Sequence, residues 1–363
     1  MEEMETESGR NLANTLIFAN PFPPSSFKLI EVSKEIASKI KNNEPLIVRG
    51  LADDYVSFCT DDETFRVKDV EITNTMVVCD KIDENSIGQE VKVKYETKSY
   101  LELTKDEGTP YLALKDLLSK QQFDLPDESD GSIEWITMED ILDEVQFSRV
   151  EVEIALAKMP VVEVNGSFRY LSKKARSYLL NSLIEAVDDD SLPEINVNHI
   201  TFDDLQRNFD FAIEDYCIKW IIQRYVDSSG RLNEFAVCQD RAVEVLEKEH
   251  EIPENLFKRK MMQLLPNGVE FNDEALKGIA ITTESIVRGM MLDYVNVEDL
   301  PSNPQIRLNM LFKIRTAWKK DDLEPYIMDF CPTKANVMPF LLKNCQQIKE
   351  GNNQLFVKRD DEF

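Results

Sequence analysis

The sequence predicts an α+β protein in which a β-rich N-terminal region is followed by tandem winged-helix domains. Short runs rich in Val, Ile, Phe and Thr fill residues 28–103, and the spacing of apolar residues becomes helical after Thr104. In the helical part, a pattern of helix, turn, helix and β-hairpin recurs along the chain. A length of 363 residues agrees with several domains of about 150 residues or fewer.

The chain is expected to begin with an acidic flexible arm, residues 1–27, that ends near Pro21-Phe-Pro-Pro24. The β-rich domain is expected over residues 28–104, with acidic turns between its strands. A sheet of this size leaves strand edges unpaired, and such edges require either a closed barrel or a partner. The expected strands are Leu46–Arg49, Tyr55–Cys59, Thr64–Val67, Met76–Cys79 and Val91–Tyr95.

The first winged-helix domain is expected over residues 105–195. Thr137-Met-Glu-Asp140 has the spacing of a capping box and predicts the start of a helix. Asn165-Gly166 predicts a tight hairpin because both positions of such a turn need a positive φ. The expected elements are helices Leu112–Leu118, Ile141–Val145 and Ser148–Ala157, strands Val161–Val164 and Phe168–Leu171, and a helix over Ala175–Val187.

Two further winged-helix domains are expected over residues 196–300 and 301–363. A helix over Ile213–Ile221 is expected to pack on the second of the three domains or to belong to a fourth. The second domain is predicted to contain helices Arg241–Lys248, Pro253–Leu265 and Asn272–Lys277 and strands Gly278–Ile281 and Ile286–Leu292. The third is predicted to contain helices Leu308–Trp318, Asp321–Phe330 and Thr333–Lys343 and strand Leu355–Lys358.

The formal net charge is −26, and it is unevenly distributed: residues 1–300 carry −28 and residues 301–363 carry +2. Such a surface repels nucleic acids and anionic membranes on average, so any contact with DNA must come from a local patch. The chain has no apolar run of membrane-spanning length and no signal-peptide pattern. Its six cysteines form no CxxC and are interpreted as unpaired thiols of a reducing compartment, the cytosol or nucleus.

The sequence offers no catalytic, cofactor-binding or metal-binding motif, and we expect neither an enzyme nor a cofactor. Walker A, GxGxxG and GxSxG patterns are absent, and His199 and His250 are the only histidines. His250-Glu-Ile-Pro-Glu254 lacks the second histidine of a zinc helix. Asp127–Gly131 does not fit a calcium loop, and Asp188-Asp-Asp190 is interpreted as a solvated turn rather than a magnesium site.

In a helix-turn-helix, the second helix of the pair enters the DNA groove with its N-terminal end first. At those positions the first domain has Glu151 and Glu153 and the second has Asp273 and Glu274, so neither should read DNA. The third domain is basic instead, although a merely solvated face is the alternative. Its candidate DNA-binding residues are Lys313, Arg315, Lys319, Lys320, Lys334, Lys343, Lys358 and Arg359. Lys173-Lys174 with Arg176 form a smaller candidate.

Several segments resemble the Dcc family, which is named for defective sister chromatid cohesion. The members of this family are non-ATPase subunits of an alternative replication factor C clamp loader. Near the N-terminus these segments are Leu46–Gly50, Cys59–Lys68 and Thr73–Met76. In the C-terminal half they are Ala275–Gly278, Leu341–Lys343 and the block Arg315-x2-Trp318-x3-Asp322-Leu-Glu-Pro325-Tyr-Ile327. The family's order of a β domain followed by winged helices covers the whole chain.

The resemblance implies a non-enzymatic, nuclear adaptor. In the family, the β domain forms shared barrels with the C-terminal tail of the large clamp-loader subunit and with a small third subunit. The module docks on DNA polymerase epsilon and helps to place PCNA at forks. From its charge, the basic third domain is expected to bring the assembly onto DNA without reading its sequence. The residues implied in partner assembly are Leu46, Ile47, Val48, Arg49, Thr64, Phe65 and Val67. The alternative from the residues alone is a free-standing winged-helix transcriptional regulator.

Overall fold

The computed structural model describes residues 15–18, 28–50, 55–81, 90–125, 134–209, 213–351 and 353–359. The chain divides into two compact units, one formed by residues 1–106 with 146–148 and the other by residues 107–145 with 149–363. Both helices and strands are present, so the fold is α+β as predicted. The described strands form four separate sheets, none of which closes into a barrel. Of the expected arm, only Thr15–Phe18 lies within the described residues.

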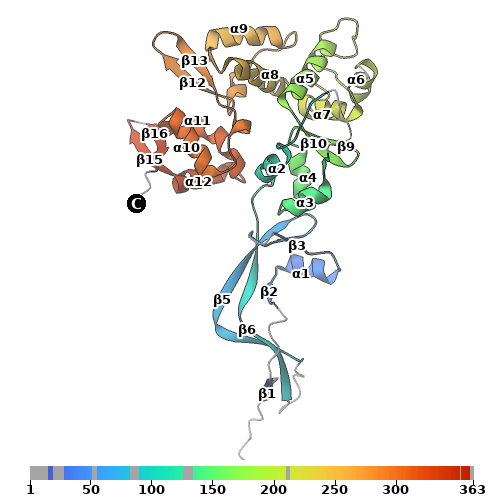
Figure 1. Cartoon of the computed structure of the whole chain (residues 1–363), viewed down its shortest axis with the longest axis vertical. Helices are drawn as coiled ribbons and strands as arrows, with labels where there is room; N and C mark the ends of the chain where they lie inside the picture. Colours follow the sequence, from blue (N-terminus) through green and yellow to red (C-terminus); the bar gives the residue numbers. More distant parts are fainter. Residues whose placement is uncertain are drawn as a thin grey trace, which may run out of the picture. The chain divides into compact units, whose positions relative to one another are not determined.

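The first unit is built on two long antiparallel strands, β5 (Thr64–Cys79) and β6 (Glu90–Lys105) (Figure 1). Beside β5 lie β4 (Ser57–Cys59) and then β3 (Ile47–Arg49). Two short strands pair in parallel with β6 on its other side. These are β1 (Thr15–Phe18) and β2 (Ile30–Glu31).

Two details of this unit correct the prediction. Thr64–Val67 and Met76–Cys79 were expected as separate strands, but both belong to β5. The polar residues between them are exposed, and a register shift between Glu71 and Met76 lets the strand continue. The region also contains a helix that was not predicted, α1 (Lys34–Lys41), whose first turn is capped by the side chain of Ser33.

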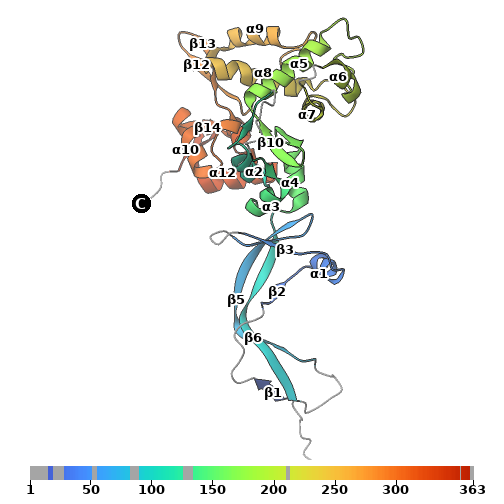
Figure 2. The same ribbon diagram turned by 45° about the vertical axis from the view of Figure 1, so that its right-hand side comes forward.

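The second unit begins with a small sheet and the helices around it (Figure 2). The capping box at Thr137 and Asp140 is formed as predicted. Asn165 and Gly166 have φ of 51° and 80°, which confirms the predicted hairpin. Its helices are α2 (Tyr111–Leu118), α3 (Met138–Glu144), α4 (Arg149–Leu156), α5 (Lys173–Val187), α6 (Phe202–Asn208) and α7 (Asp215–Tyr225). Its strands are β7 (Gln122–Phe123), β8 (Ile136–Thr137), β9 (Val161–Val164) and β10 (Ser167–Leu171).

Two three-stranded sheets follow in the same unit. The elements of the first are α8 (Glu234–Glu249), β11 (Glu251–Pro253), α9 (Glu254–Leu264), η1 (Asp273–Leu276), β12 (Ala280–Ser285) and β13 (Gly289–Tyr294). After η2 (Val297–Asp299), the second comprises α10 (Pro304–Ile314), β14 (Ala317–Lys319), α11 (Lys320–Leu323), η3 (Glu324–Tyr326), η4 (Met328–Phe330), η5 (Lys334–Asn336), α12 (Val337–Asn344), β15 (Cys345–Glu350) and β16 (Asn353–Lys358).

The three small sheets share one strand order. In each, the last strand along the chain pairs with its hairpin partner and with one earlier antiparallel strand, giving β8–β10–β9, β11–β13–β12 and β14–β16–β15. In the first sheet β10 also pairs in parallel with β7. The recurrence expected from the pattern of helices and hairpins is therefore present in the topology of the sheets.

The C-terminal helices are shorter than predicted. The helix expected over Leu308–Trp318 ends at Ile314, and Trp318 lies in β14, where its side chain is buried. The helix expected over Asp321–Phe330 is divided into one α-helical and two 3₁₀ turns, because Pro325 cannot donate a backbone hydrogen bond. Asn272–Lys277 forms only the 3₁₀ turn η1, and Ile286 lies in a hairpin turn rather than a strand.

The apolar cores of the two units differ in size. In the first unit, the buried cluster consists of Ile36, Phe58 and Phe65 with a few partly buried neighbours. In the second, one cluster extends over α5, α7 and the start of α8, and another surrounds Trp318 and Phe356. Val91, Val93 and Tyr95 of β6 are buried as well, outside the cluster around Phe58.

Candidate partner and nucleic-acid interfaces

In the sheet of the first unit, long stretches of strand edge have no described strand beside them. β4 pairs with β5 only at Thr64–Arg66, so from Val67 to Cys79 no described strand lies beside β5 on the side away from β6. On the outer side of β6, β1 pairs with residues 90–93 and β2 with residues 101–102. Between these, residues 94–100 have no described strand on that side. Such edges present backbone N–H and C=O groups to which an added strand can bind.

Apolar side chains lie exposed along these edges. Val77 and Val78 are 37% and 39% exposed on β5, and Val48 is 59% exposed on the outermost strand β3. β-branched side chains in an edge strand are suited to packing against the side chains of a neighbouring strand.

The residues implied in partner assembly fall into two groups. Ile47 and Val48 are exposed on β3, where a partner could reach them. The other residues contact the unit itself. Leu46, Phe65 and Val67 pack in its apolar cluster, and the buried hydroxyl of Thr64 accepts a 2.8 Å hydrogen bond from the Ser148 N–H. Arg49 is partly buried.

Three of the eight C-terminal cations bind neighbouring groups of the chain. Arg315 lies 3.1 Å from an Asp322 carboxylate oxygen, donates to the Thr282 carbonyl at 2.8 Å and stacks over Trp318. Lys320 lies 3.6 Å from Glu324. Arg359 donates to the carbonyls of Lys343 and Leu342 at the end of α12, at 2.8 and 3.0 Å.

The other five cations are exposed, and none has a carboxylate of the described residues within 4.0 Å. These residues are Lys313, Lys319, Lys334, Lys343 and Lys358. Lys319 lies opposite Leu355 in the sheet, and Lys358 lies opposite Cys345. Directly paired residues share a face of the sheet, so Lys319 lies on the face of Leu355. Leu355 and Lys358 are three residues apart on β16, where side chains alternate, so Lys319 and Lys358 project from opposite faces of this sheet. Arg359 brings Lys343 close to Lys358, so these three residues form one group.

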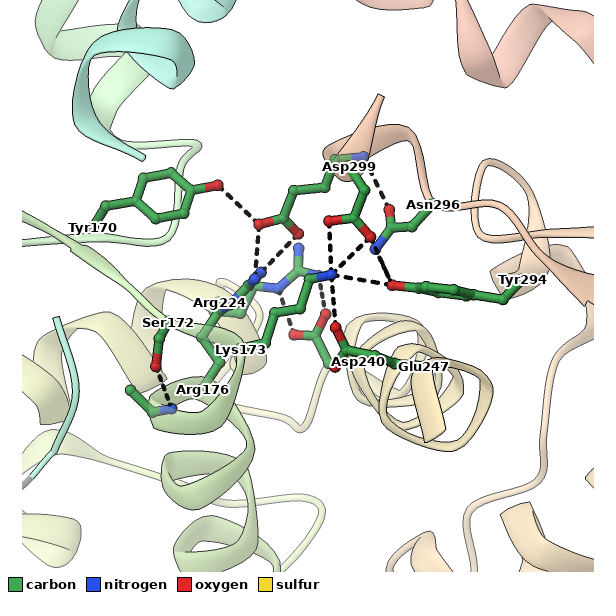
Figure 3. Close-up of polar contacts among 12 residues, drawn as sticks. Tyr170, Ser172, Lys173, Arg176, Arg224, Asp240, Glu247, Tyr294, Asn296 and Asp299 are labelled. Carbon is green, nitrogen blue, oxygen red and sulfur yellow. Dashed lines mark hydrogen bonds and ion pairs between the residues drawn. The ribbon is translucent and has the colours of Figure 1, made fainter. Parts of the chain in front are cut away.

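Two of the three residues of the smaller basic candidate, Lys173 and Arg176, belong to a network of ion pairs and are not free to bind phosphate (Figure 3). The Lys173 ammonium, at the start of α5, lies 2.9 Å from Glu247 of α8 and 2.7 Å from Asp299 of η2. It also donates to the hydroxyl of Tyr294 at 3.2 Å. One turn further along α5, Arg176 donates to Glu298 at 2.7 and 3.1 Å. Lys174 alone remains exposed without a described ion pair.

Burial disfavours the charged forms of the residues in this network, but the attraction between oppositely charged partners has the larger effect on their pKa values. Burial favours the neutral forms of Lys173 and Arg176, and the carboxylates that bind them still raise the pKa of both. Burial also disfavours the charge of Glu298, yet the Arg176 guanidinium and the Tyr170 hydroxyl lower its pKa. The network therefore connects α5, α8 and η2 as a set of satisfied charges.

This network could not be found from the sequence because its partners are distant along the chain. Arg176 and Glu298 are 122 residues apart, and no local spacing relates them. The partly buried pair of Arg224 with Asp240, whose carboxylate also accepts from the Tyr225 hydroxyl, was missed for the same reason. In Figure 3, Arg176 lies next to Arg224 and Asp240.

The chemistry of the described residues offers no obvious catalytic group. No three His, Cys, Asp or Glu side chains come together there as metal ligands would. The six cysteines all lie within the described residues and form no disulfide, as predicted. Burial raises the pKa of the Cys217 thiol to about 12 and that of Cys345 to about 11, so both stay protonated and are poor nucleophiles. No described helix is long and apolar enough to cross a membrane.

Comparison with known proteins gives one consistent family. The family model described as sister chromatid cohesion protein Dcc1 matches residues 27–327. The Danio rerio protein named sister chromatid cohesion protein DCC1 is 26% identical over 95% of this chain and 92% of its own length. The Homo sapiens protein of that name is 25% identical over 92% of this chain and 88% of its own. A Dictyostelium discoideum protein named probable sister chromatid cohesion protein DCC1 is 25% identical over 94% and 96%. The chain belongs to the family of the sister chromatid cohesion protein Dcc1.

Proposed function

We propose that this chain acts in sister chromatid cohesion as a non-catalytic subunit of an alternative clamp loader that acts on PCNA at replication forks. The observation that supports the proposal is the edge of β5 from Val67 to Cys79, beside which no described strand lies on the side away from β6. A protein that worked alone would leave these edges exposed to aggregation. In a nuclear complex, strands of other subunits would cover them.

We infer that the partner strands come from the C-terminal tail of the large clamp-loader subunit and from a small third subunit, which together complete barrels with this sheet. Exposed Val48, Val77 and Val78 support the inference, because they lie where added strands would contact the sheet. The completed first unit would then dock on DNA polymerase epsilon and link the polymerase to the loader.

We further propose that the second unit contains tandem winged-helix domains. Their support is the common strand order, in which one antiparallel strand that precedes the hairpin pairs with the outer side of the hairpin's second strand. These preceding strands are β8, β11 and β14. In the third of them, α12 would occupy the position of the recognition helix, and Lys343 and Lys358 would contact the DNA backbone without reading its sequence.

The geometry does not favour a free-standing transcriptional regulator. The segment in the recognition position of the middle domain is the single turn η1, which carries Asp273 and Glu274. In the first domain, α4 presents Glu151 in its first turn, and the nearby Arg149 lies 3.7 and 3.9 Å from two carboxylates. Carboxylates at these positions would repel phosphates.

The test measures whether binding of the partner subunits depends on the edge of β5. The full chain would be co-expressed with the two proposed partner subunits and purified through a tag on the large subunit. Val77→Lys should reduce the amount of this chain that co-purifies by about tenfold. The side chains of an added strand would pack against position 77 and remove water from the lysine ammonium. Val287→Lys, the same change on an exposed hairpin turn of the second unit, should leave co-purification unchanged.

Amide hydrogen exchange would locate the contact. In the free chain, the outward-facing amides of Val67–Cys79 should exchange rapidly, and the partner subunits should protect them. Equal co-purification of both variants, or protection of this edge already in the free chain, would contradict the proposal.

A further inference from the structure

One helix of the second unit exposes an apolar stripe that the proposed function does not use. The helix is α10, in which Ile306, Met310 and Ile314 are 54%, 40% and 48% exposed. Residues four apart lie on one face of an α-helix, so these three side chains form a continuous row, here called the α10 ridge. The opposite side of α10 packs in the apolar cluster around Trp318 and Phe356. The ridge is therefore not part of the core.

Buried hydrogen bonds hold α10 in place. Arg307 is fully buried and donates to the Pro301 carbonyl at 2.7 Å and to the Tyr326 carbonyl at 2.9 Å. Its guanidinium also lies 2.6 Å from Asp329 and 4.3 Å from the centre of the Phe330 ring. The ridge is therefore presented on a fixed helix, and a partner could bind it without first ordering this part of the chain.

The exposed face of α10 has no negative charge. α10 contains neither Asp nor Glu, although the whole chain has 68 of these residues. Lys313 lies three residues after Met310 and is therefore its neighbour on the helix surface. Lys313 is exposed, and no carboxylate of the described residues lies within 4.0 Å of it. A ligand with carboxylates beside its apolar side chains would complement this face.

The shape of the α10 ridge suits a second helix. Side chains four apart form ridges that fit into the grooves of another helix, and two helices that pack through such ridges cross at about 50°. Helices that cross at this angle touch over only a few turns. Three side chains are therefore enough for the centre of such a contact.

Two other occupants fit the α10 ridge less well. A stable interface buries about 1,200–2,000 Å² in total, which three partly exposed side chains on each of two copies of this chain would not provide. Two copies would also repel each other, because each has a net charge of −26. DNA would neutralise Lys313 but would leave the apolar side chains of the ridge in water.

We propose that the α10 ridge binds an acidic, amphipathic helix of another protein, which packs its apolar face across Met310 and places an aspartate or glutamate near Lys313. The apolar contact would provide affinity and the charge pair would provide selectivity. The ridge shares no residue with the edge of β5 or with the group around Arg359. Failure of this proposal would therefore leave the proposed function standing, and the reverse also holds.

The probe is a fluorescein-labelled synthetic helix of about 20 residues, with leucine at every third or fourth position and glutamate beside the leucines. It would be titrated with the full chain and followed by fluorescence anisotropy. Because the probe and the chain are both negative, non-specific attraction cannot produce binding. The same peptide with alanine in place of leucine should not bind, and replacement of its glutamates by glutamine should weaken binding about threefold.

Variants of the chain come in matched pairs of exposed residues. Met310→Glu should weaken binding of the probe more than about tenfold, because it places a carboxylate in the apolar contact. Met262→Glu makes the same change on α9, where the methionine is 77% exposed, and should alter binding less than about twofold. Lys313→Glu should weaken binding about fivefold, and Lys349→Glu on β15 should have little effect. Equal losses within either pair would overturn the proposal.

Methyl NMR of the full chain, labelled at isoleucine and methionine methyl groups, would locate the contact. The signals of Ile306, Met310 and Ile314 should shift as the probe is added, whereas those of the exposed Met262 and Ile286 should not. If a short DNA duplex shifts the three signals and the probe does not, DNA is the occupant. If they shift with the concentration of the chain alone, the occupant is a second copy. Either result would show that the proposal is wrong.

Discussion

Glu298 shows how a single residue can hold distant parts of the second unit together. Its carboxylate accepts from Arg176 of α5 and from the Tyr170 hydroxyl of β10, although it belongs to the short turn η2. Arg176 and Glu298 are 14% and 21% exposed, so removing one charge leaves the other largely buried. An uncompensated buried charge is one of the more destabilising changes that a substitution can make.

We therefore predict that Glu298→Gln lowers the free energy of unfolding of the second unit by about 2–3 kcal/mol, a value reduced from that of a fully buried pair because some solvent reaches it. Glu153→Gln is the matched control. Its partner Arg149 is 3.9 Å away, and both side chains are about half exposed, so the change should be within about 0.5 kcal/mol. Urea unfolding would measure both, and equal losses would contradict the role of burial.

The effect of Glu298 should also depend on pH. Its pKa in the folded chain lies below the ordinary value of 4.5, so the carboxylate stabilises the fold above that pH. The stabilisation disappears as pH falls through the lowered native pKa. We expect the difference between the wild type and Glu298→Gln to be constant near neutral pH and to shrink below about pH 4.5. A difference that grows on acidification would contradict this sign.

Residues whose partners are close in sequence could be predicted, and those with distant partners could not. The capping box of Thr137 and Asp140 spans a single turn, so its spacing was sufficient to find it. Lys173 and Arg176 were interpreted as a basic patch because nothing local indicated the carboxylates of Glu247, Glu298 and Asp299. Such a patch can be distinguished from an ion-pair network only when the tertiary contacts are known.

Among the elements, turns with strong local preferences agree with the prediction and C-terminal helices do not. Asn165-Gly166 forms the hairpin because few residues accept a positive φ at both positions. Trp318 was placed in a helix because apolar residues precede it at helical spacing. It lies in β14 instead, where pairing with Phe356 of β16 adds to its burial. The pairing partner is 38 residues later, beyond the range of any periodicity.

Two glycines should respond differently to an added methyl group. Gly166 has a φ of 80° and no atom within 4 Å of the added Cβ, so Gly166→Ala should cost about 1 kcal/mol through backbone strain alone. Gly50 has a φ of 138°, and its Cβ would lie 2.8 Å from the Tyr55 carbonyl oxygen. Because that oxygen belongs to the backbone, Gly50→Ala should cost more than about 2 kcal/mol.

The two glycine substitutions can be followed separately. The three tryptophans, Trp135, Trp220 and Trp318, all lie in the second unit, as does Gly166. Gly166→Ala should therefore shift the urea transition seen by tryptophan fluorescence. Gly50→Ala should leave that transition in place and instead reduce amide protection in β3 to β6. A larger loss of stability from Gly166→Ala than from Gly50→Ala would refute the steric argument.

At the scale of the whole molecule, the distribution of charge and the unpaired strand edges both favour protein partners over DNA for most of the chain. Residues 1–300 carry a net charge of −28, so long-range forces keep this part of the chain away from DNA. The edges of the first unit that have no described strand beside them instead suit protein partners. The C-terminal residues carry a net charge of +2, and we propose that this part of the chain approaches a phosphate backbone.

The strand register determines which of these residues can act together on DNA. Lys343 and Lys358 belong to the group around Arg359, and Lys319 projects from the opposite face of the sheet. We predict that Lys343→Glu combined with Lys358→Glu weakens binding to a short DNA duplex and lowers the slope of log affinity against log salt by about 0.9 for each phosphate that the protein no longer neutralises. Lys319→Glu should alter both quantities much less. If Lys319→Glu is the more harmful change, DNA binds the other face of the sheet, and if none of these substitutions changes the slope, the basic residues are only solvated.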